Sequence, residues 1–226
     1  MYLYNEIKMV DYNNFAKTFS KSRKNMKWWE MEYFLEKLSF SDQTKILDVG
    51  CGNGRFLWEL INNFWEKIEK QNYLWADLSS GLLEEARKDY ADFEFIELNM
   101  LNLDIIDSQF TDIFFYASFH HLQNIEDRKT VLQKTYDVLT KWGKVYMTNW
   151  ALNSDLNKKR YSEAQIPESQ NEFGSVDFNI KLAWNDRYYH CFSLEELSFL
   201  AEQTGFKIIE NRLFENQRNF TTILEK

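Results

Sequence analysis

The sequence predicts an α/β protein built on a doubly wound, mostly parallel sheet of seven strands that ends in an antiparallel hairpin. Short apolar segments of strand length alternate along most of the chain with longer segments whose apolar residues recur at helical spacing. The last two strand-like segments, 206–214 and 218–226, are joined by only a few polar residues. Because a parallel connection needs a dozen or more residues, these two strands should pair antiparallel.

The predicted elements follow one another in a regular order. Apolar residues at helical spacing predict helices at 28–38, 56–64, 82–86, 131–139 and 194–201. Runs of apolar and β-branched residues predict strands at 45–49, 72–76, 93–98, 111–117, 144–150, 206–214 and 218–226. Helices between consecutive strands imply a parallel sheet with helices on both faces.

We expect one domain over residues 1–226, because no repeat, low-complexity tract or Pro/Gly linker interrupts the chain. An N-terminal helical segment covers 1–39, a ligand-binding core covers 40–150, and a C-terminal helix and hairpin cover 193–226. Between them, residues 151–192 interrupt the alternation of strands and helices. This insertion and the N-terminal segment are the candidate lid over the carboxyl ends of the strands, where sheets of this kind bind ligands.

Composition excludes several classes of protein. Hydrophobic residues make up 44% and aromatic residues 17% of the chain, which excludes a disordered protein. Charged residues interrupt the long apolar runs, so no transmembrane helix is expected. The first residues include acids where a signal peptide has a cationic start and an apolar block, so we expect a cytoplasmic protein that contacts no membrane. Cys51 and Cys191 fit neither a disulfide framework nor a metal-ligand spacing, and we expect two buried thiols and no metal.

The charge distribution is uneven. A net charge of −8 argues against broad, non-specific nucleic-acid binding. Residues 17–27 nevertheless carry five positive charges and no negative charge, and Lys158, Lys159 and Arg160 form a second small cluster. These clusters are either ordinary solvated surface or a local patch that faces an anion.

The most informative stretch is ILDVGCGNGRF, residues 46–56, in which a buried strand carrying Asp48 runs through three glycines into a helix. Glycines at alternate positions permit a tight turn and a close approach of the backbone to a ligand. In the dinucleotide fingerprint G-x-G-x-x-G the third glycine stands one residue later, where this chain has Arg55. A carboxylate at Asp48 would repel a pyrophosphate but attract a cation. S-adenosylmethionine, which carries a sulfonium and an ammonium and no phosphate, therefore fits this turn better.

This D-x-G-x-G-x-G turn resembles motif I of the class I S-adenosylmethionine-dependent methyltransferases, which have a Rossmann-like fold. Asp77 matches the acid that binds both ribose hydroxyls in that family, and Asn99 with Met100 matches the adenine-binding pair. The segment YASFHHL, 116–122, resembles the wall of the methionine end. The resemblance covers 40–150 and implies S-adenosylmethionine as cofactor. It implies these cofactor-binding residues: Asp48, Gly50, Cys51, Gly52, Gly54, Asp77, Leu78, Asn99, Met100, Ala117 and His121.

Two segments outside this core, within 12–29 and 183–197, resemble the tRNA wobble-uridine methyltransferases that esterify 5-carboxymethyluridine. The matching residues are Tyr12, Ala16, Phe19, Ser20, Arg23, Trp28 or Trp29, Trp184, Arg187, Tyr188, Tyr189, His190 and Phe192. Ala183 departs from the pattern, because it stands where that family has proline. The resemblance implies tRNA as a partner. Relatives in that group work with a small zinc-ribbon activator protein, which is a second candidate partner.

The expected chemistry suits these residues. Methyl transfer to a carboxylate needs alignment and exclusion of water rather than a general base, because the carboxylate is already ionised at neutral pH. Arg23 and Arg187 are expected to hold the carboxylate, since guanidinium binds it in a fork. Tyr188 and His190 are expected to add hydrogen-bond donors or to stack on the base, which completes a predicted catalytic set of four. The alternative is a strand that packs its tyrosines in the core and leaves Arg187 at the surface.

Two other functions stay open. A methyltransferase that acts on a small molecule such as a quinone or phenol would usually need a general base, and His120 or His121 beside the methyl-donor site could serve. The net charge of −8 favours this alternative, because an enzyme that binds tRNA alone is usually more basic. A cofactor-binding protein without catalysis is the third alternative, and the intact motifs argue against it.

Tryptophan occupies positions where the family usually has small residues. Trp75 stands two residues before Asp77, Trp142 lies in the turn before the fifth strand, and Trp58 lies in the predicted helix 56–64. We expect Trp75 to add bulk beside the adenosine pocket and Trp142 to be strained at a position that needs positive φ. Either each tryptophan packs, or the gene uses UGA for glycine and these codons have been read as tryptophan. UGG codons at 75 and 142 would exclude the second explanation.

Overall fold

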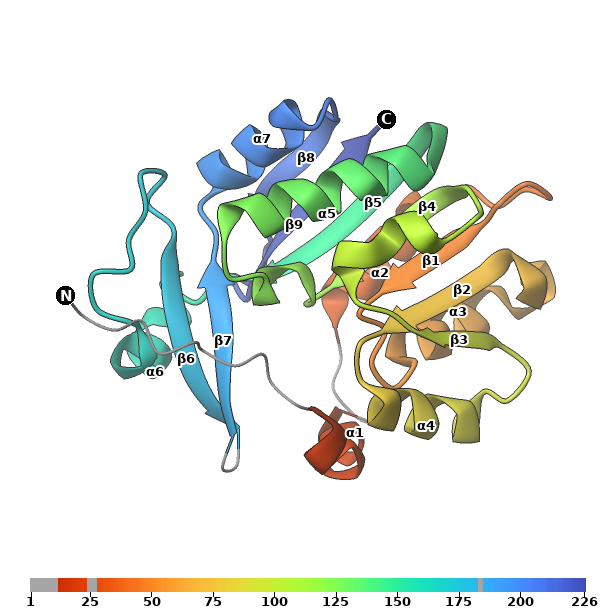
Figure 1. The fold of residues 1–226 in the computed structure, drawn as a ribbon, viewed down its shortest axis with the longest axis horizontal. Helices are drawn as coiled ribbons and strands as arrows, with labels where there is room; N and C mark the ends of the chain where they lie inside the picture. Colours follow the sequence, from red (N-terminus) through yellow and green to blue (C-terminus); the bar gives the residue numbers. More distant parts are fainter. Residues whose placement is uncertain (1–11, 24–27, 183–184) are drawn as a thin grey trace.

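The structure, a computed structural model, describes three stretches of the chain, residues 12–23, 28–182 and 185–226 (Figure 1). The first residues, 1–11, and the end of the basic run, 24–27, lie outside the described residues. The same holds for Ala183 and Trp184, two positions of the segment compared with the wobble-uridine enzymes.

The main sheet contains seven strands, which are β1 (Ile46–Val49), β2 (Tyr73–Asp77), β3 (Glu94–Glu97), β4 (Phe110–Tyr116), β5 (Leu139–Trp150), β8 (Lys207–Leu213) and β9 (Asn219–Glu225). Their order across the sheet is β3-β2-β1-β4-β5-β9-β8. The first five strands pair in parallel, whereas β9 pairs antiparallel with both β5 and β8. The predicted fold class is therefore confirmed, and the fifth strand begins earlier than the expected 144–150.

Helices cover both faces of this sheet (Figure 1). They are α2 (Trp29–Lys37), α3 (Arg55–Phe64), α4 (Ser80–Asp89), α5 (Ile125–Val138) and α7 (Leu194–Gln203). One core cluster includes Val131 of α5 and Phe115 of β4, and the other includes Phe34 of α2 and Phe114 of β4. Successive strand residues thus enter opposite layers, as the strand period of two requires. Within the described ranges, no helix is long and apolar enough to cross a membrane.

The insertion 151–192 forms a small unit beside the main sheet. It contains α6 (Lys158–Tyr161) and a separate antiparallel pair of strands, β6 (Val176–Leu182) and β7 (Asn185–Cys191). Figure 1 shows this hairpin and α1 (Ala16–Arg23) beside the carboxyl ends of the parallel strands. Short 3-10 helices complete the chain, at Tyr12–Phe15 (η1), Trp65–Lys67 (η2), Lys70–Asn72 (η3), Met100–Ile105 (η4), Phe119–His121 (η5) and Ser162–Ala164 (η6).

The three tryptophans at positions expected to be small have different surroundings. Trp75 is fully buried, with its ring centroid 6.1 Å from that of Phe56 and 6.3 Å from that of Phe95. It packs into a helix-covered core layer and does not line the cavity at the carboxyl edge of the sheet, so the expectation of added bulk there is wrong. Trp142 has a φ of 66° and is 68% exposed, which confirms the expected backbone strain. Trp58 is also exposed, on the outer side of α3.

Candidate active site

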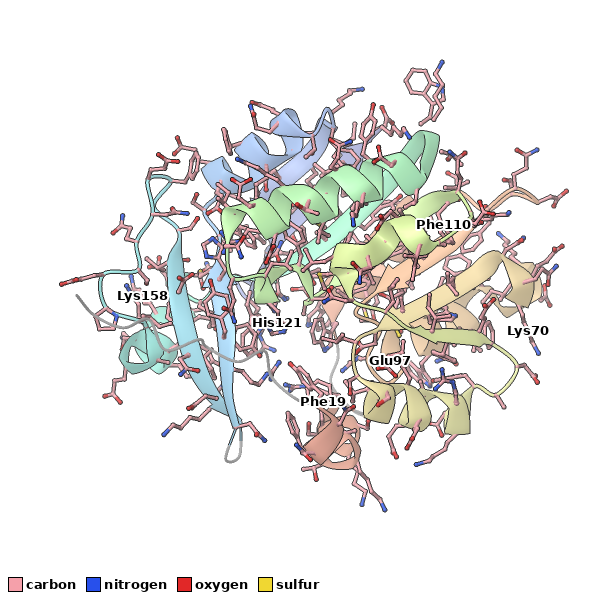
Figure 2. The ribbon with its side chains drawn as sticks, in the orientation of Figure 1. Phe19, Lys70, Glu97, Phe110, His121 and Lys158 are labelled. Carbon is pink, nitrogen blue, oxygen red and sulfur yellow. The ribbon has the colours of Figure 1, made fainter. Side chains whose placement is uncertain are left out.

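A cavity of about 1060 Å³ lies at the carboxyl ends of the parallel strands. Its walls come from the glycine turn after β1, the ends of β2 and β4, the N-terminal helix α1 and the strand β7. Figure 2 shows His121 near the centre of the molecule and Phe19 on α1, and both residues line this cavity. The volume is large enough for a nucleoside-sized ligand together with an acceptor group.

The glycine turn brings backbone rather than side chains to the cavity. Gly50 has a φ of 80°, and a Cβ there would lie 2.3 Å from Cβ of Ser118, so only glycine fits. The backbone N–H of Gly52 donates to Oδ2 of Asp77 over 2.8 Å, which ties the turn to the end of the next strand. Gly54 does not line the cavity: its Cα packs near the ring of Tyr90, and its carbonyl accepts the first hydrogen bond of α3. Gly54 therefore has a packing role, and its expected contact with the cofactor is corrected.

Asp48 presents a buried carboxyl at the cavity wall, and its Oδ1 has no hydrogen-bond partner among the described residues. Burial, together with the charge of Asp77, raises the pKa of Asp48 well above its usual range. The hydroxyl of Tyr116 on the neighbouring strand is buried without a partner in the same part of the structure. A cationic ligand would favour the ionised form of Asp48 and use its unoccupied acceptor atom. These groups fit the sulfonium and ammonium of S-adenosylmethionine.

Asp77 ends β2 and is held by the backbone on both sides. Its Oδ1 accepts from the N–H of Ser79 and its Oδ2 accepts from the N–H of Gly52, each over 2.8 Å. Burial raises the pKa of Asp77, and these backbone hydrogen bonds oppose the rise. Each carboxylate oxygen keeps a second lone pair, so the group can still accept from two ribose hydroxyls. Leu78 follows at the cavity wall.

The remaining predicted cofactor residues also line the cavity. The side chain of Asn99 accepts from the N–H of Leu101 and begins η4 at Met100, which turns this loop toward the cavity. Ala117 has a φ of 50°, an unusual conformation for alanine, and its N–H donates to Oγ1 of Thr148 over 3.0 Å. Cys51 is buried, and burial raises the pKa of its thiol well above the usual range, so it is no nucleophile.

The adjacent histidines are neutral and their hydrogen bonds fix the tautomers. Nδ1 of His121 lies 2.9 Å from the carbonyl oxygen of Tyr188, which can only accept, so Nδ1 carries the proton. Burial lowers the pKa of His121 to about 3, which leaves Nε2 as an unprotonated acceptor. Nδ1 of His120 accepts from the N–H of Trp150 over 3.2 Å, so its proton is on Nε2. Burial lowers the pKa of His120 well below its usual range.

Arg187 and Arg23 share one wall of the cavity. Arg187 is only 6% exposed, so its side chain is buried. The alternative that leaves Arg187 at the surface is therefore wrong. Its guanidinium carbon lies 5.1 Å from the ring centre of Tyr12 and 5.7 Å from that of Phe19. Its Nε has no hydrogen-bond partner, and no ion pair of the described residues includes it. Burial and the charge of Arg187 both lower the pKa of Arg23, so the two cations lie close enough to repel each other.

Tyr188 and His190 do not offer polar groups to the cavity. Alternate residues of a strand point to opposite sides, so Arg187 and the two residues in question cannot all face the ligand. The hydroxyl of Tyr188 donates to Oδ1 of Asp177 over 2.8 Å, although other atoms of Tyr188 line the cavity. Both ring nitrogens of His190 contact carboxylates, and His190 is absent from the cavity wall. The predicted contact of these two residues with the acceptor is therefore corrected.

Tyr189 lines the cavity, although from the sequence it is only a matching residue with no predicted role in the site. Its ring centroid lies 5.0 Å from that of Trp150 and 4.8 Å from that of His121, and its ring also lies against Arg187. Tyr161 of the insertion adds a further ring beside Trp150 at 5.6 Å. Residues two apart in a strand face the same side, so the sequence position of Tyr189 predicts that it faces the cavity together with Arg187.

The Rossmann-like fold, the glycine turn and the two acids at adjacent strand ends define a class I S-adenosylmethionine-dependent methyltransferase, and the chain is an enzyme of this class. A family model described as a methyltransferase domain matches residues 46–143. The structure is similar to that of an S-adenosylmethionine-dependent methyltransferase from Clostridium acetobutylicum, with a TM-score of 0.67 and 15% identity over 95% of this chain and 98% of the other.

The chain is also similar in sequence to more particular relatives. A putative methyltransferase of Encephalitozoon cuniculi is 26% identical over 221 residues, covering 95% of this chain and 93% of that protein. The tRNA (carboxymethyluridine(34)-5-O)-methyltransferase of Schizosaccharomyces pombe is 25% identical over 231 residues, covering 95% of this chain and 94% of that protein. A ubiquinone/menaquinone biosynthesis C-methyltransferase of Campylobacter jejuni is 28% identical over 141 residues, covering 58% of each chain.

Proposed function

We propose that this methyltransferase esterifies the carboxylate of 5-carboxymethyluridine at the wobble position of tRNA. The observation that carries the proposal is the buried guanidinium of Arg187, which lines the cavity close to Arg23 and forms no ion pair within the described part of the chain. A buried cation is costly unless an anion accompanies it. An acceptor carboxylate supplies that anion, whereas a neutral phenol or quinone does not.

The chain's residues suit a carboxylate acceptor. When bound, S-adenosylmethionine supplies a methyl group attached to a positively charged sulfur. A carboxylate is ionised at neutral pH, so the reaction needs no group to remove a proton. The fork of Arg187 can hold one edge of the carboxylate and leave a lone pair for the attack. The rings of Tyr12, Phe19 and Tyr189 surround this guanidinium and exclude water, which strengthens its hold on the anion.

Similarity along the whole chain supports the same proposal. The match to the fission yeast tRNA enzyme covers 95% of this chain, whereas the match to the quinone enzyme covers 58%. The residues that line the acceptor side of the cavity lie mostly in the N-terminal segment and the insertion, outside the family match at 46–143. The longer match therefore carries more weight for the choice of acceptor.

Basic residues around the cavity support tRNA as the partner. Arg160 of α6, Lys181 of β6 and Arg218 near β9 are exposed and also line the cavity. Lys17 and Lys21 are exposed on α1, a helix that lines the cavity with Phe19 and Arg23. Cations on separate elements around an opening can contact successive phosphates of an RNA strand while one nucleotide enters. We propose tRNA, and a small activator subunit as in the related enzymes, as the partners of this otherwise acidic protein.

One observation favours a second candidate, a small-molecule methyltransferase. His121 keeps an unprotonated Nε2 beside the cavity, and this atom could accept the proton of a phenol. Arg187 would then have no anionic partner in the acceptor. Transfer to a phenol by the wild type, lost on His121→Ala substitution, would support this candidate with His121 as the base. No transfer to any phenol by the wild type would exclude it.

Methyl transfer from labelled S-adenosylmethionine tests the proposal. The acceptors are tRNA that carries 5-carboxymethyluridine, the same tRNA without the carboxymethyl group, and a set of small phenols and quinols, each with and without a candidate zinc-ribbon activator. We expect label only on the first tRNA, in a form released by mild alkali, because a methyl ester is hydrolysed whereas a methyl ether or C-methyl group is not. Label on the phenols, or alkali-stable label on either tRNA, would overturn the proposal.

A further inference from the structure

A buried network of charges lies on the side of β7 that faces away from the cavity. Nδ1 of His190 lies 2.6 Å from Oδ1 of Asp177, and its Nε2 lies 2.8 Å from Oε2 of Glu196. The other oxygen of Glu196 accepts from Nη1 of Arg128 over 2.9 Å. The side chains of His190, Glu196 and Arg128 are at most 4% exposed. The network therefore joins β7 to β6, α7 and α5 without taking part in the cavity wall.

The hydrogen bonds define the charge of this network. Ionised carboxylates only accept, so both ring nitrogens of His190 must donate, and the ring is an imidazolium. Burial alone would raise the pKa of Glu196, but the hydrogen bond and charge of His190, together with Arg128, lower it to about 2. Two anions, the partly exposed Asp177 and the buried Glu196, are thus balanced by two cations, His190 and Arg128. Loss of the His190 proton would place a ring lone pair against a carboxylate oxygen.

The same network holds two walls of the cavity together. Nε of Arg128 donates to the carbonyl oxygen of Leu122 over 3.2 Å, directly after the His120–His121 pair. Nδ1 of His121 in turn donates to the carbonyl of Tyr188 over 2.9 Å, within β7. The hydroxyl of Tyr188 donates a hydrogen bond to Asp177, which is itself part of the network. Any shift of β7 therefore moves its cavity-facing side chains relative to η5.

We propose that His190 is a positioning residue: its imidazolium, held between Asp177 and Glu196, fixes β7 so that Arg187 and Tyr189 present an anion site to the methyl acceptor. The nature of that acceptor rests on the function proposed above. His190 touches neither acceptor nor cofactor, so its effect reaches the reaction through β7 alone. Most of the predicted cofactor contacts, including the glycine turn and Asp77, lie at the ends of β1 and β2. His121 is the predicted cofactor residue that contacts β7, so substitution of His190 should change cofactor affinity much less than acceptor affinity.

Groups from several elements surround His190. They are Asp177 on β6, Glu196 on α7, Arg128 on α5 and the hydroxyl of Tyr188 on β7, and the neutral His120 of η5 lies nearby. Removal of the imidazole by substitution leaves the carboxylates of Asp177 and Glu196 without the donor that they share. Affinity for the acceptor should then fall, because β7 loses this anchor.

Three variants test the proposal. His190→Gln removes the cation, and His190→Gln with Glu196→Gln removes one cation and one anion, so that the double variant keeps its charge balance if the single variant fails to fold. Leu200→Ala, in the same helix as Glu196 and fully buried, is the control that lowers stability without touching the network. Each variant is measured for KM with an anticodon stem-loop carrying 5-carboxymethyluridine, and for its Kd for S-adenosylmethionine by calorimetry.

We expect both His190 variants to raise KM for the stem-loop at least about tenfold, as loss of a buried charge partner does at other sites, with Kd for the cofactor changed by less than about twofold. An unchanged KM, a Kd that shifts with KM, or the same rise in KM for Leu200→Ala would overturn the proposal.

Amide hydrogen exchange separates this inference from the proposed function. If the wild type transfers no methyl group to the stem-loop, the proposed acceptor is wrong, but the positioning role is still tested. His190→Gln should then speed exchange in residues 185–191 and leave residues 46–49 of β1 unchanged. Equal exchange at 185–191 in the wild type and the variant would contradict the positioning role whatever the acceptor is.

Discussion

The guanidinium carbon of Arg187 lies 4.9 Å from the ring centre of Tyr189, and these two residues occupy alternate positions of β7 that face the cavity. A fixed cation and a fixed aromatic plane therefore stand side by side at the acceptor end of the site. A planar base that carries a carboxylate on a short arm matches this pair, because the ring can stack while the arm reaches the guanidinium.

Substitution of Arg187 should separate acceptor binding from cofactor binding. Arg187→Ala is expected to lower kcat/KM for the carboxylate acceptor by about a hundredfold or more, since truncation of one partner of a buried charge pair costs about 2–5 kcal/mol. Arg187→Lys keeps the positive charge but loses the two-pronged guanidinium. Its kcat/KM should lie between those of the wild type and Arg187→Ala. Calorimetry should show a cofactor Kd close to that of the wild type. A marked loss of cofactor affinity in Arg187→Ala would instead place this residue on the methionine carboxylate or in the fold.

Substitution of Asp77 should weaken cofactor binding, which substitution of Arg187 should leave nearly unchanged. Asp77→Asn replaces one of the two acceptor oxygens by a donor, so the side chain can no longer hold the Gly52 N–H and two ribose hydroxyls together. We expect the Kd for S-adenosylmethionine to rise about tenfold or more, in line with about 1.5–3 kcal/mol for a hydrogen bond to a charged group. Asp92→Asn is the control, because Asp92 is an exposed partner of Lys70 away from the cavity. Equal affinities in the two variants would argue against ribose binding by Asp77.

Trp142 should be replaceable by glycine with a gain in stability. Its φ of 66° costs a side-chain-bearing residue about 1–2 kcal/mol, and its exposed indole recovers little of this by packing. Trp142→Gly should therefore raise the free energy of unfolding by about 1 kcal/mol, as measured by urea denaturation. Trp142→Ala keeps the strain and removes the indole, so it should show no such gain. An equal gain in both variants would assign the effect to the indole instead of the backbone.

Replacement of Trp75 by glycine should lower stability, in contrast to the same replacement of Trp142. Its side chain is fully buried among aromatic rings of the core, so Trp75→Gly should lower the free energy of unfolding by about 3–5 kcal/mol or more through the cavity it leaves. The unpartnered Nε1 of Trp75 offsets only part of this packing. Thermal unfolding of the two variants would thus distinguish a core residue at 75 from a strained one at 142. A stable Trp75→Gly protein would favour glycine at both positions, and the codons give an independent check.

The cofactor half of the site could be predicted from sequence because its geometry is local. Asp48 and Gly50 lie at the end of one strand and Asp77 at the end of the next, and parallel strands bring such ends to one edge of the sheet. Gly54 belongs to the same glycine-rich motif but does not line the cavity. Its lack of a side chain lets α3 begin beside Tyr90. Spacing alone does not distinguish a glycine that meets a ligand from one that meets a neighbouring helix.

The acceptor half could be predicted only in part. The resemblance of the segment 183–197 to the wobble-uridine enzymes points to Arg187, but it points equally to Tyr188 and His190. A strand turns alternate residues to opposite sides, so these two do not face the cavity in the way that Arg187 does. The groups that bind His190, Asp177 and Glu196, belong to β6 and α7. Contacts of this kind are set by the packing of separate elements, and no periodicity in the sequence records them.

Asp112 should make the stability of the fold depend on pH. Its carboxyl is 8% exposed near the start of β4, and burial raises its pKa to about 6 against the opposing hydrogen bond from Thr111. An acid whose pKa is raised by folding binds its proton more tightly in the folded state. Its contribution to stability is therefore present below the ordinary pKa of aspartate, near 4, and is lost as pH rises through about 6.

Asp112→Asn should remove this dependence, because the amide fills the same space and carries no charge at any pH. Relative to the variant, the wild type should lose up to about 3 kcal/mol of unfolding free energy between pH 4 and pH 7, as followed by urea denaturation at several pH values. Asp155→Asn is the control, since Asp155 is exposed and its pKa is lowered by the hydrogen bond with Lys158. Parallel curves for the wild type and Asp112→Asn across this range would show that Asp112 stays ionised in the folded protein.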